Sequence, residues 1–224
     1  MKVGYKSLFF DLDDTLWDTC SNNKACLEEI FTEHKFDRYY DSFEAFYDTY
    51  MPYNLHLWEQ YRKNEIDRHF LICERFLHVL RPMGIDDSDY ALKLNWDFLQ
   101  RTTVKTKIIP GAIELLEYLK PFYRMFILSN GFREIQSLKL RNSGLSPYFE
   151  KMILSEDANI QKPNKEIFDF ALRNTNSRRS ESLMIGDSWE ADIAGARQAK
   201  IPQMWFNPNN LPTKGFEPTY QVRS

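Results

Sequence analysis

The 224-residue sequence lacks several features that would place a protein in a class at once. Its three cysteines, Cys20, Cys26 and Cys73, are odd in number and form no Cys-x-x-Cys pair, which favours free thiols in a reducing compartment over a disulfide framework. No stretch resembles a secretory signal or a membrane span. The formal net charge of −3 provides no basic field for nucleic acid. We therefore expect a cytoplasmic protein, a monomer or homodimer, that binds neither membranes nor nucleic acids.

A long middle part of the chain has no convincing strand pattern. From residue 21 to residue 99 it shows only helical periodicity, and Pro52 is expected to interrupt a helix that begins near residue 42. A later helix is expected to end at Pro82-Met83-Gly84. Roughly eighty helical residues are too many for one connection between strands. We therefore expect an inserted all-helical subdomain over 18–102, which divides a core formed by 1–17 and 103–224.

Outside that part, apolar runs alternate with helical patterns. Strands are expected at 5–10, 125–128, 151–154, 182–185, 203–206 and 219–222. Helices are expected at 133–142, 164–173 and 190–199, and after Pro110-Gly111. Strands that are apolar throughout and alternate with helices indicate a parallel sheet that is covered on both faces. The expected fold class is therefore α/β, a doubly wound parallel sheet with an inserted helical subdomain.

Polar residues follow three of these strands. Asp11 and Asp13 come directly after the first, Ser129-Asn130 after the second, and Gly186-Asp187 after the fourth, while Lys162 precedes a helix. The carboxyl ends of parallel strands share one edge of a sheet, where sites form. Two neighbouring carboxylates repel each other, and a divalent cation such as Mg²⁺ would offset that repulsion. The sequence therefore predicts a site with Mg²⁺ at this edge.

These residue types suit phosphoryl transfer. A carboxylate can act as the nucleophile and a second one as the acid and base, while a metal ion, a lysine and hydroxyl groups handle the phosphoryl charge. Each element has a simpler reading when taken alone. Ser129-Asn130 is compatible with a turn, Lys162 with a solvated loop, and Asp187 with a helix N-cap. Their combination at one sheet edge favours a site.

The motifs also resemble a known family. Asp11-Leu12-Asp13-Asp14-Thr15, Ser129-Asn130, Lys162-Pro163, and Gly186-Asp187 with Asp192 resemble, in order and spacing, the four signature motifs of the haloacid dehalogenase (HAD) superfamily. The helical insert resembles the C1-type cap of that family. Further similarity to the pyrimidine 5′-nucleotidase branch lies in Asn130-Gly131-Phe132, Gly144-Leu145, Tyr148-Phe149, Ser155-Glu156, Leu57-Trp58, Tyr61 and Glu65-Ile66.

The resemblance implies a role for each motif residue. Asp11 would be the nucleophile and a Mg²⁺ ligand. Asp13 would be the general acid and base, and its backbone carbonyl would also reach the metal. Asp187 would be a further metal ligand, and Asp192 would orient metal-bound waters or Lys162. The residues expected to hold the phosphoryl group are Thr15, Ser129, Asn130 and Lys162.

The cap of such an enzyme would select the substrate. Trp17, Trp58 and Phe132 are candidates for stacking on a nucleobase, and Asn54 for a hydrogen bond to it, although Trp58 fits packing inside the cap equally well. Asp13 favours phosphate esters over carbon–halogen bonds, since an alkoxide leaving group needs a proton. We expect a Mg²⁺-dependent phosphomonoesterase for small soluble phosphate esters, most of all nucleoside 5′-monophosphates. The alternatives are a phosphatase of sugar phosphates or phosphoglycolate, a sugar phosphomutase, and a non-catalytic binding protein.

Overall fold

The computed structural model describes residues 4–224, which divide into two units. The α/β unit consists of the chain up to Thr19 together with Thr106–Ser224, and the helical unit is Cys20–Lys105. These divisions lie two and three residues beyond the expected ones at 17 and 102, and residues 1–3 of the expected core lie outside the described residues. Within 4–224, no helix is both long and apolar enough to cross a membrane.

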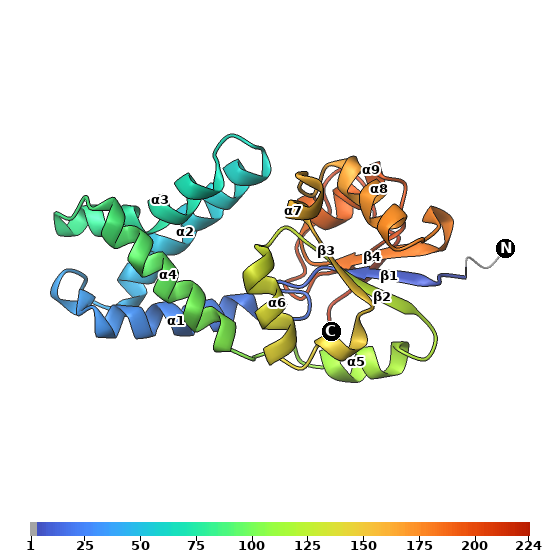
Figure 1. Cartoon of the computed structure of the whole chain (residues 1–224), viewed down its shortest axis with the longest axis horizontal. Coiled ribbons are helices and arrows are strands. Elements are labelled where there is room, and N and C mark those ends of the chain that lie inside the picture. The colour runs from blue at the N-terminus through green and yellow to red at the C-terminus, as the bar shows by residue number, and fades with distance from the viewer. Residues whose placement is uncertain (1–3) are drawn as a thin grey trace. The chain divides into compact units, whose positions relative to one another are not determined.

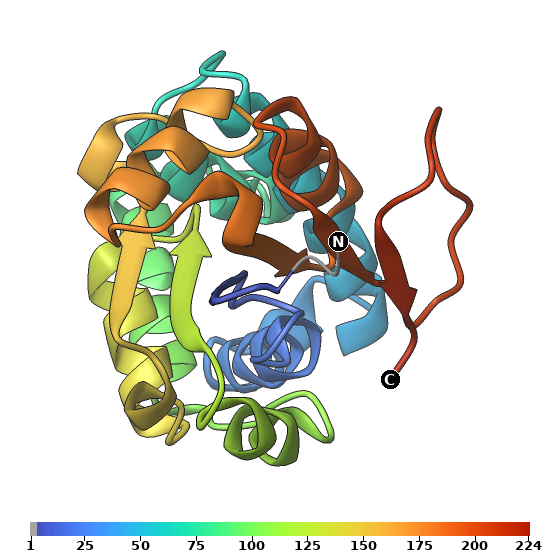
Figure 2. The same cartoon turned by 90° about the vertical axis from the view of Figure 1, so that its right-hand side faces the viewer.

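The α/β unit is built on a six-stranded parallel sheet with the order β3-β2-β1-β4-β5-β6 (Figure 1). The strands are β1 (Ser7–Phe10), β2 (Arg124–Ser129), β3 (Lys151–Leu154), β4 (Ser182–Gly186), β5 (Gln203–Phe206) and β6 (Tyr220–Val222). Figure 2 shows the dark red β6, next to the C-terminus, at one edge of the sheet. The predicted doubly wound parallel sheet is confirmed, and its first strand lies between the second and the fourth.

Helices cover both faces of this sheet (Figure 1). Residues that alternate along a strand point to opposite faces, so Phe10 packs with Leu116 and Leu140 on one side and Phe9 packs with Phe168 on the other. The first face is covered by α5 (Ala112–Leu119) and α6 (Arg133–Asn142), and the second by α8 (Lys165–Asn174) and α9 (Gly195–Gln198). Shorter elements are η3 (Ser146–Tyr148), α7 (Ser155–Ala158), η4 (Arg179–Glu181) and the π-helix η5 (Trp189–Ala194).

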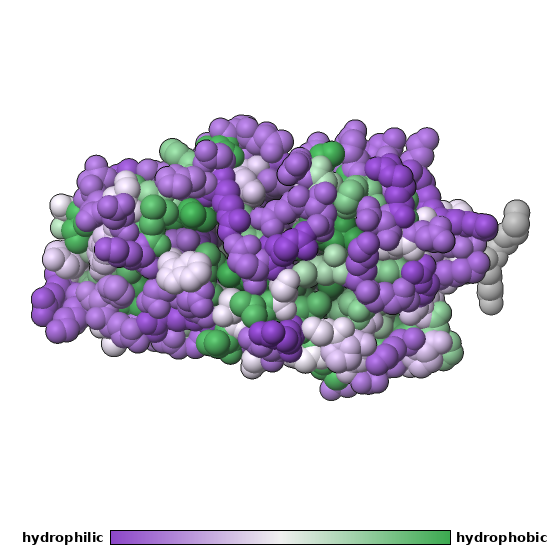
Figure 3. Space-filling model, in the orientation of Figure 1, coloured by the Kyte–Doolittle hydropathy of each residue, from purple (hydrophilic) through white to green (hydrophobic). Residues whose placement is uncertain are grey.

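The helical unit has an aromatic core. Its elements are α1 (Thr19–Glu33), which begins at the last residue of the α/β unit, η1 (Phe36–Arg38), α2 (Phe43–Arg62), α3 (Arg68–Leu80), η2 (Arg81–Met83) and α4 (Ser88–Val104). The fully buried rings of Phe46, Tyr50 and Phe76 pack against one another along α2 and α3. In Figure 3, hydrophilic residues cover most of the visible face of each unit, with apolar residues scattered among them. The inserted helical subdomain is confirmed.

Two expected elements differ from the structure. Pro52 does not interrupt its helix, because α2 runs through it from Phe43 to Arg62. An interior proline costs about 3 kcal/mol, but Tyr50 before it and Leu57 after it are both buried on the same helix, and a break would cost that shared burial. The helix expected at 190–199 is instead a π-helix followed by one short α-helix.

Candidate active site

Three neighbouring strands end at the same edge of the sheet and carry the predicted motif residues there. Asp11 follows β1, Asp187 follows β4, and Ser129 is the last residue of β2. The backbone N–H of Asp11 donates to the carbonyl of Ile185 at 2.9 Å, which places the ends of β1 and β4 side by side. The parallel register of the sheet therefore brings these motifs together, although they lie far apart in the sequence.

The loop after β1 folds back tightly on itself. The backbone N–H groups of Leu16 and Trp17 both donate to the carbonyl of Leu12, at 3.0 and 2.9 Å. Asp14 has a φ of 55°, in the left-handed region that Asp tolerates better than most residues. Asp14 therefore shapes the turn that leaves Asp11 and Asp13 at the sheet edge.

The ammonium group of Lys162 lies at the centre of the buried charges. Its Nζ donates to Asp11 Oδ1 at 2.7 Å, to Asp192 Oδ1 at 2.6 Å and to the carbonyl of Leu128 at 2.8 Å. An ammonium group has three N–H donors, so this side chain, only 2% exposed, has an acceptor for each. Burial acts to lower the pKa of Lys162, but the charges of Asp11 and Asp192 outweigh it and raise that pKa above its usual value.

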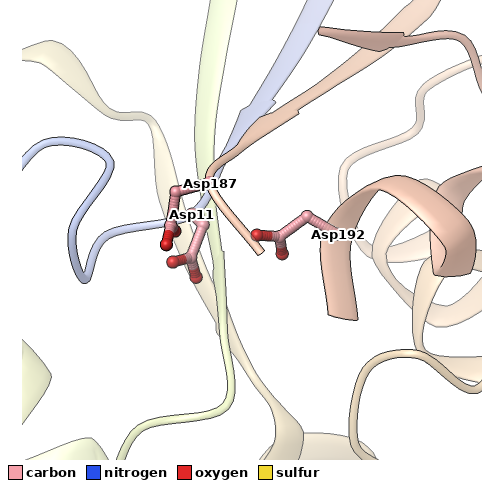
Figure 4. A group of neighbouring side chains, drawn as sticks. All are labelled: Asp11, Asp187 and Asp192. Carbon is pink, nitrogen blue, oxygen red and sulfur yellow. The ribbon is translucent and has the colours of Figure 1, made fainter. Parts of the chain in front are cut away.

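Three carboxylates face one another beside this lysine. Asp11, Asp187 and Asp192 each place one oxygen within 4.8 Å of the others. In Figure 4, Asp11 and Asp187 lie side by side at two strand ends, and Asp192 points toward them from η5. Asp192 is fully buried, and its Oδ2 accepts the backbone N–H of Ser188 at 3.1 Å. Gly186 permits this arrangement, because a Cβ there would collide with the Asp192 carboxylate.

The same crowding shifts the protonation of the carboxyl groups. Burial, together with the charges of Asp192 and Asp13, raises the pKa of Asp11 to about 7, even though Lys162 acts against it. Burial and the charges of Asp11 and Asp192 likewise raise the pKa of Asp187 well above its usual range. Both carboxylates are therefore unfavourable as anions unless further positive charge is supplied.

A divalent cation fits this donor set. Carboxylate oxygens are the ligands that Mg²⁺ prefers in proteins. Asp11 and Asp187 follow adjacent strands, and the mutual repulsion of their buried charges is what a bound cation would relieve. Asp192 is committed to Lys162 and Ser188 through its two oxygens, so it suits a supporting position better than a ligand position.

The side chain of Thr15 is tied to Asp187. Its Oγ1 accepts the backbone N–H of Asp187 at 3.0 Å and donates to Oδ1 of the same residue at 3.1 Å. On the other side, Trp205 donates its indole N–H to the Asp187 carbonyl at 2.8 Å. These contacts fix the position of the Asp187 carboxylate. Trp205 was not foreseen, because a tryptophan in an apolar run reads only as core.

The side chain of Asn130 joins two of the motifs. Its Nδ2 donates to the carbonyl of Lys162 at 2.9 Å, and its Oδ1 accepts the backbone N–H of Lys162 at 2.9 Å. The neighbouring Ser129 Oγ accepts the backbone N–H of Gly131 at 3.1 Å. Asn130 thus holds the loop of Lys162 against the end of β2.

Asp13 is held from α6. Lys139 donates from Nζ to Asp13 Oδ1 at 2.7 Å, and Gln136 donates from Nε2 to Oδ2 at 2.5 Å. Thr19 adds a bond to Oδ1 at 2.9 Å. Burial acts to raise the pKa of Asp13, but the charge of Lys139 and these hydrogen bonds outweigh it and lower that pKa below its usual value.

Lys139 and Gln136 were missed at the level of sequence. A signal was present, since the buried positions of α6 are Ile135, Gln136, Lys139 and Leu140, so two of the four inward residues are polar. A lysine and a glutamine on the inward face of a helix require partners, and this helix begins directly after the Ser129-Asn130 motif.

The four residues proposed for substrate selection lie in different surroundings. Trp17 is fully buried in the core of the α/β unit, and Phe132 is 4% exposed, so neither ring offers a free face in this structure. Asn54 and Trp58 belong to α2 of the helical unit. Asn54 is 8% exposed and Trp58 is half-buried, which leaves Trp58 as the most accessible of the four.

Comparison with known proteins gives concordant matches. Residues 5–200 match the model of the haloacid dehalogenase-like hydrolase family. The chain is 31% identical over 219 residues to the pyrimidine 5′-nucleotidase YjjG of Escherichia coli, covering 97% of this chain and 93% of that protein. It is 30% identical over 215 residues to a ribulose-1,5-bisphosphate 5-phosphatase of Halopiger xanaduensis, covering 91% and 85%.

A solved structure agrees in fold along nearly the whole chain. The HAD-hydrolase YfnB from Bacillus subtilis, whose crystal structure is bound to magnesium, superposes with a TM-score of 0.87 at 28% identity and covers 98% of this chain and 95% of that one. The family match spans most of the chain and includes every motif residue at the sheet edge. The protein belongs to the haloacid dehalogenase-like hydrolase family.

Proposed function

We propose that this protein is a Mg²⁺-dependent phosphomonoesterase that forms an aspartyl-phosphate on Asp11. The observation that carries the proposal is the pairing of two different carboxylates at one strand end. Asp11 is buried against Lys162, while Asp13, two residues on, is half-buried and bonded to Lys139. Without ligands, the pKa of Asp11 is raised and that of Asp13 is lowered. A bound cation would favour the ionised form of Asp11, the nucleophile, and the negative charge of a bound phosphate ester would raise the pKa of Asp13 so that it can carry the proton.

The reaction would proceed in two steps on these side chains. A carboxylate oxygen of Asp11 forms a bond to phosphorus as the bond to the leaving oxygen breaks, and the Asp13 carboxyl gives that oxygen its proton. Asp13, now a carboxylate, then takes a proton from water as the water oxygen attacks phosphorus. The bond to Asp11 breaks, inorganic phosphate leaves, and both side chains return to their starting states.

The other motif residues would stabilise the phosphoryl charge. Lys162, the hydroxyl of Ser129 and the backbone N–H groups near Leu12 and Asn130 would supply positive charge and hydrogen-bond donors at the sheet edge. Asp11, Asp187 and the backbone carbonyl of Asp13 would hold the Mg²⁺, which when bound neutralises phosphoryl oxygens during transfer. Asp192 would act by holding Lys162, the role that its 2.6 Å contact supports.

We propose nucleoside 5′-monophosphates as the preferred substrates. The relative YjjG is named a pyrimidine 5′-nucleotidase and matches nearly the full chain. Trp58, on α2 of the helical unit, would then contact the base, and Asn54 would hydrogen-bond to it. The similarity to a ribulose-1,5-bisphosphate 5-phosphatase makes sugar phosphates the second candidate class.

The test is phosphate release from a substrate panel in the presence of Mg²⁺. The panel contains pyrimidine and purine nucleoside 5′-monophosphates, hexose phosphates, pentose phosphates and phosphoglycolate, with Asp11→Asn as the blank. A preference for pyrimidine monophosphates supports the full proposal, and Trp58→Ala should then raise KM for cytidine monophosphate without changing turnover of p-nitrophenyl phosphate. A preference for a sugar phosphate would support the phosphomonoesterase reaction and contradict the proposed nucleotide substrate. Full activity of Asp11→Asn, or a product that keeps its phosphate on another carbon, overturns the phosphomonoesterase.

A further inference from the structure

Lys139 is a buried charged side chain for which the reaction above has no direct use. It lies in the middle of α6, is 6% exposed, and has its Nζ 4.2 Å from the centroid of the Trp17 ring. The carboxylate that it meets is Asp13, at 2.7 Å. A buried ammonium group is costly unless it is paired, so the contact with Asp13 is what makes Lys139 acceptable at this position.

Gln136, one helical turn before Lys139, donates a hydrogen bond to the second oxygen of the Asp13 carboxylate. Its Nε2 lies 2.5 Å from Asp13 Oδ2 and 2.8 Å from Ser129 Oγ, so it bridges the proton-transfer carboxyl and a residue expected to hold the phosphoryl group. Gly131 leaves space for this bridge, because a Cβ at that position would stand 2.5 Å from Gln136 Cδ. Both oxygens of Asp13 are thus held by donors from a single helix.

We propose that Lys139 and Gln136 are positioning residues that hold the Asp13 carboxyl group in line with the leaving oxygen and the attacking water. The proposal rests on the assigned role of Asp13 in the reaction. Neither side chain needs to touch the substrate, since each acts through Asp13. A rigid helix that begins next to the phosphate-binding loop is suited to this task, because displacing a catalytic group by about 1 Å can cost about 100-fold in rate.

The test is a double-mutant cycle on cytidine monophosphate and p-nitrophenyl phosphate. An alkoxide leaving group needs the proton of Asp13, whereas p-nitrophenolate leaves without it, and kcat/KM reports only the steps up to departure of the leaving group. We expect Lys139→Met to lower kcat/KM for cytidine monophosphate about 10- to 100-fold and for p-nitrophenyl phosphate less than about 3-fold. In an Asp13→Asn background the same change should add less than about 3-fold.

Matched variants separate positioning from folding. Lys139→Arg should recover part of the loss, and Gln136→Leu and Gly131→Ala should reproduce a smaller version of the same substrate pattern. Arg141→Met on the exposed side of the same helix is the control and should leave both substrates unchanged. The melting temperature of each variant is measured to verify that it is folded under the assay conditions.

Two results overturn the inference. Losses that multiply in the double variant would mean that Lys139 acts independently of Asp13. An equal fall for both substrates would mean that it serves phosphate binding or the fold. Failure of the underlying function is seen elsewhere, in a wild-type protein that releases no phosphate or in an Asp11→Asn variant that still does.

Discussion

The two units of the molecule differ in the partners of their buried charged groups. In the α/β unit, Lys162 is in contact with two buried carboxylates, Asp11 and Asp192, and Asp187 lies beside them. In the helical unit, the buried guanidinium of Arg75 meets the neutral side chain of Asn95, with Nε 2.9 Å from Oδ1, and the face of the Phe98 ring at 4.9 Å. The buried charges named in the first unit contact one another, whereas the buried guanidinium of the second contacts a neutral amide and an aromatic ring.

The difference indicates different uses. A cluster of like charges raises the pKa of its own members, so it stores unfavourable energy that a cation and a phosphate ester can release. A single guanidinium that is hydrogen-bonded and stacked on rings is a structural feature whose value lies in folding. The first unit should therefore respond to substitution in activity, and the second in stability.

The largest expected effect is that of Asp11→Asn. It removes the nucleophile, so phosphate release should fall by about 10⁴-fold or more. Because burial and neighbouring charges disfavour the ionised form of Asp11, the metal-free variant at about pH 8 should unfold at a temperature no lower than that of the wild type. Phosphate assays and thermal unfolding check both parts.

The matched control for that variant is Asp14→Asn in the same loop. Asn tolerates the left-handed φ of residue 14, and the substitution removes one negative charge, as Asp11→Asn does. The activity of Asp14→Asn should therefore stay within about 3-fold of the wild type. Equal losses in the two variants would show that charge in the loop, rather than the nucleophile, accounts for the effect, and the comparison between the units would then fail.

The second effect is stabilisation by Mg²⁺ that depends on pH. The pKa of Asp11 is raised from 3.8 to about 7 in the folded state, so the stability linked to its proton is present below the unfolded value and is lost as pH rises through about 7. Mg²⁺ competes with that proton, so its shift of the melting temperature should grow from about pH 5 to about pH 8. Thermal unfolding with Mg²⁺ and with EDTA measures it, and Asp187→Asn should flatten the trend. An equal shift at both pH values would contradict a site formed by these carboxylates.

The features that could be predicted from the sequence are those set by local patterns. The strands at 151–154 and 203–206 and the helix at 133–142 have the predicted bounds, because each is set by a local apolar run or period. Asp11 and Asp187 were foreseen because a polar residue directly after a buried strand of a parallel sheet can lie only at the shared edge. These are consequences of neighbouring residues and of one rule of topology.

What could not be predicted depends on contacts between distant residues. The role proposed for Lys139 depends on its contact with Asp13, which is 126 positions earlier in the chain. Trp17 is a candidate for stacking on a nucleobase because it follows the motif, yet the loop turns back on Leu12 and the ring is fully buried. Pro52 lies inside a helix because the burial of residues on both sides outweighs its local preference. In each case tertiary packing decided against the local pattern.

The third prediction concerns the buried pair of the helical unit. Asn95→Leu would leave the Arg75 guanidinium without its hydrogen-bond acceptor and should cost about 3 kcal/mol or more of unfolding free energy. Arg75→Met with Asn95→Leu should recover to within about 1 kcal/mol of the wild type, since both polar groups are then removed. Urea unfolding measures both, and kcat for p-nitrophenyl phosphate should not change. A double variant as unstable as the single one would show that the guanidinium is stabilising in its own right.

The smallest effect tests the same unit at its surface. Ser42 caps α2 by accepting the backbone N–H of Ala45 at 3.1 Å. Ser42→Ala leaves that N–H without its cap and should cost about 1 kcal/mol, whereas Ser42→Asp, which can accept the same bond, should stay close to the wild type. Neither change should alter turnover of p-nitrophenyl phosphate, because the cap lies at the start of a helix that supplies no reacting group. Urea unfolding resolves the difference, and a loss of turnover without a loss of stability would reverse the assignment of stability to the helical unit and activity to the α/β unit.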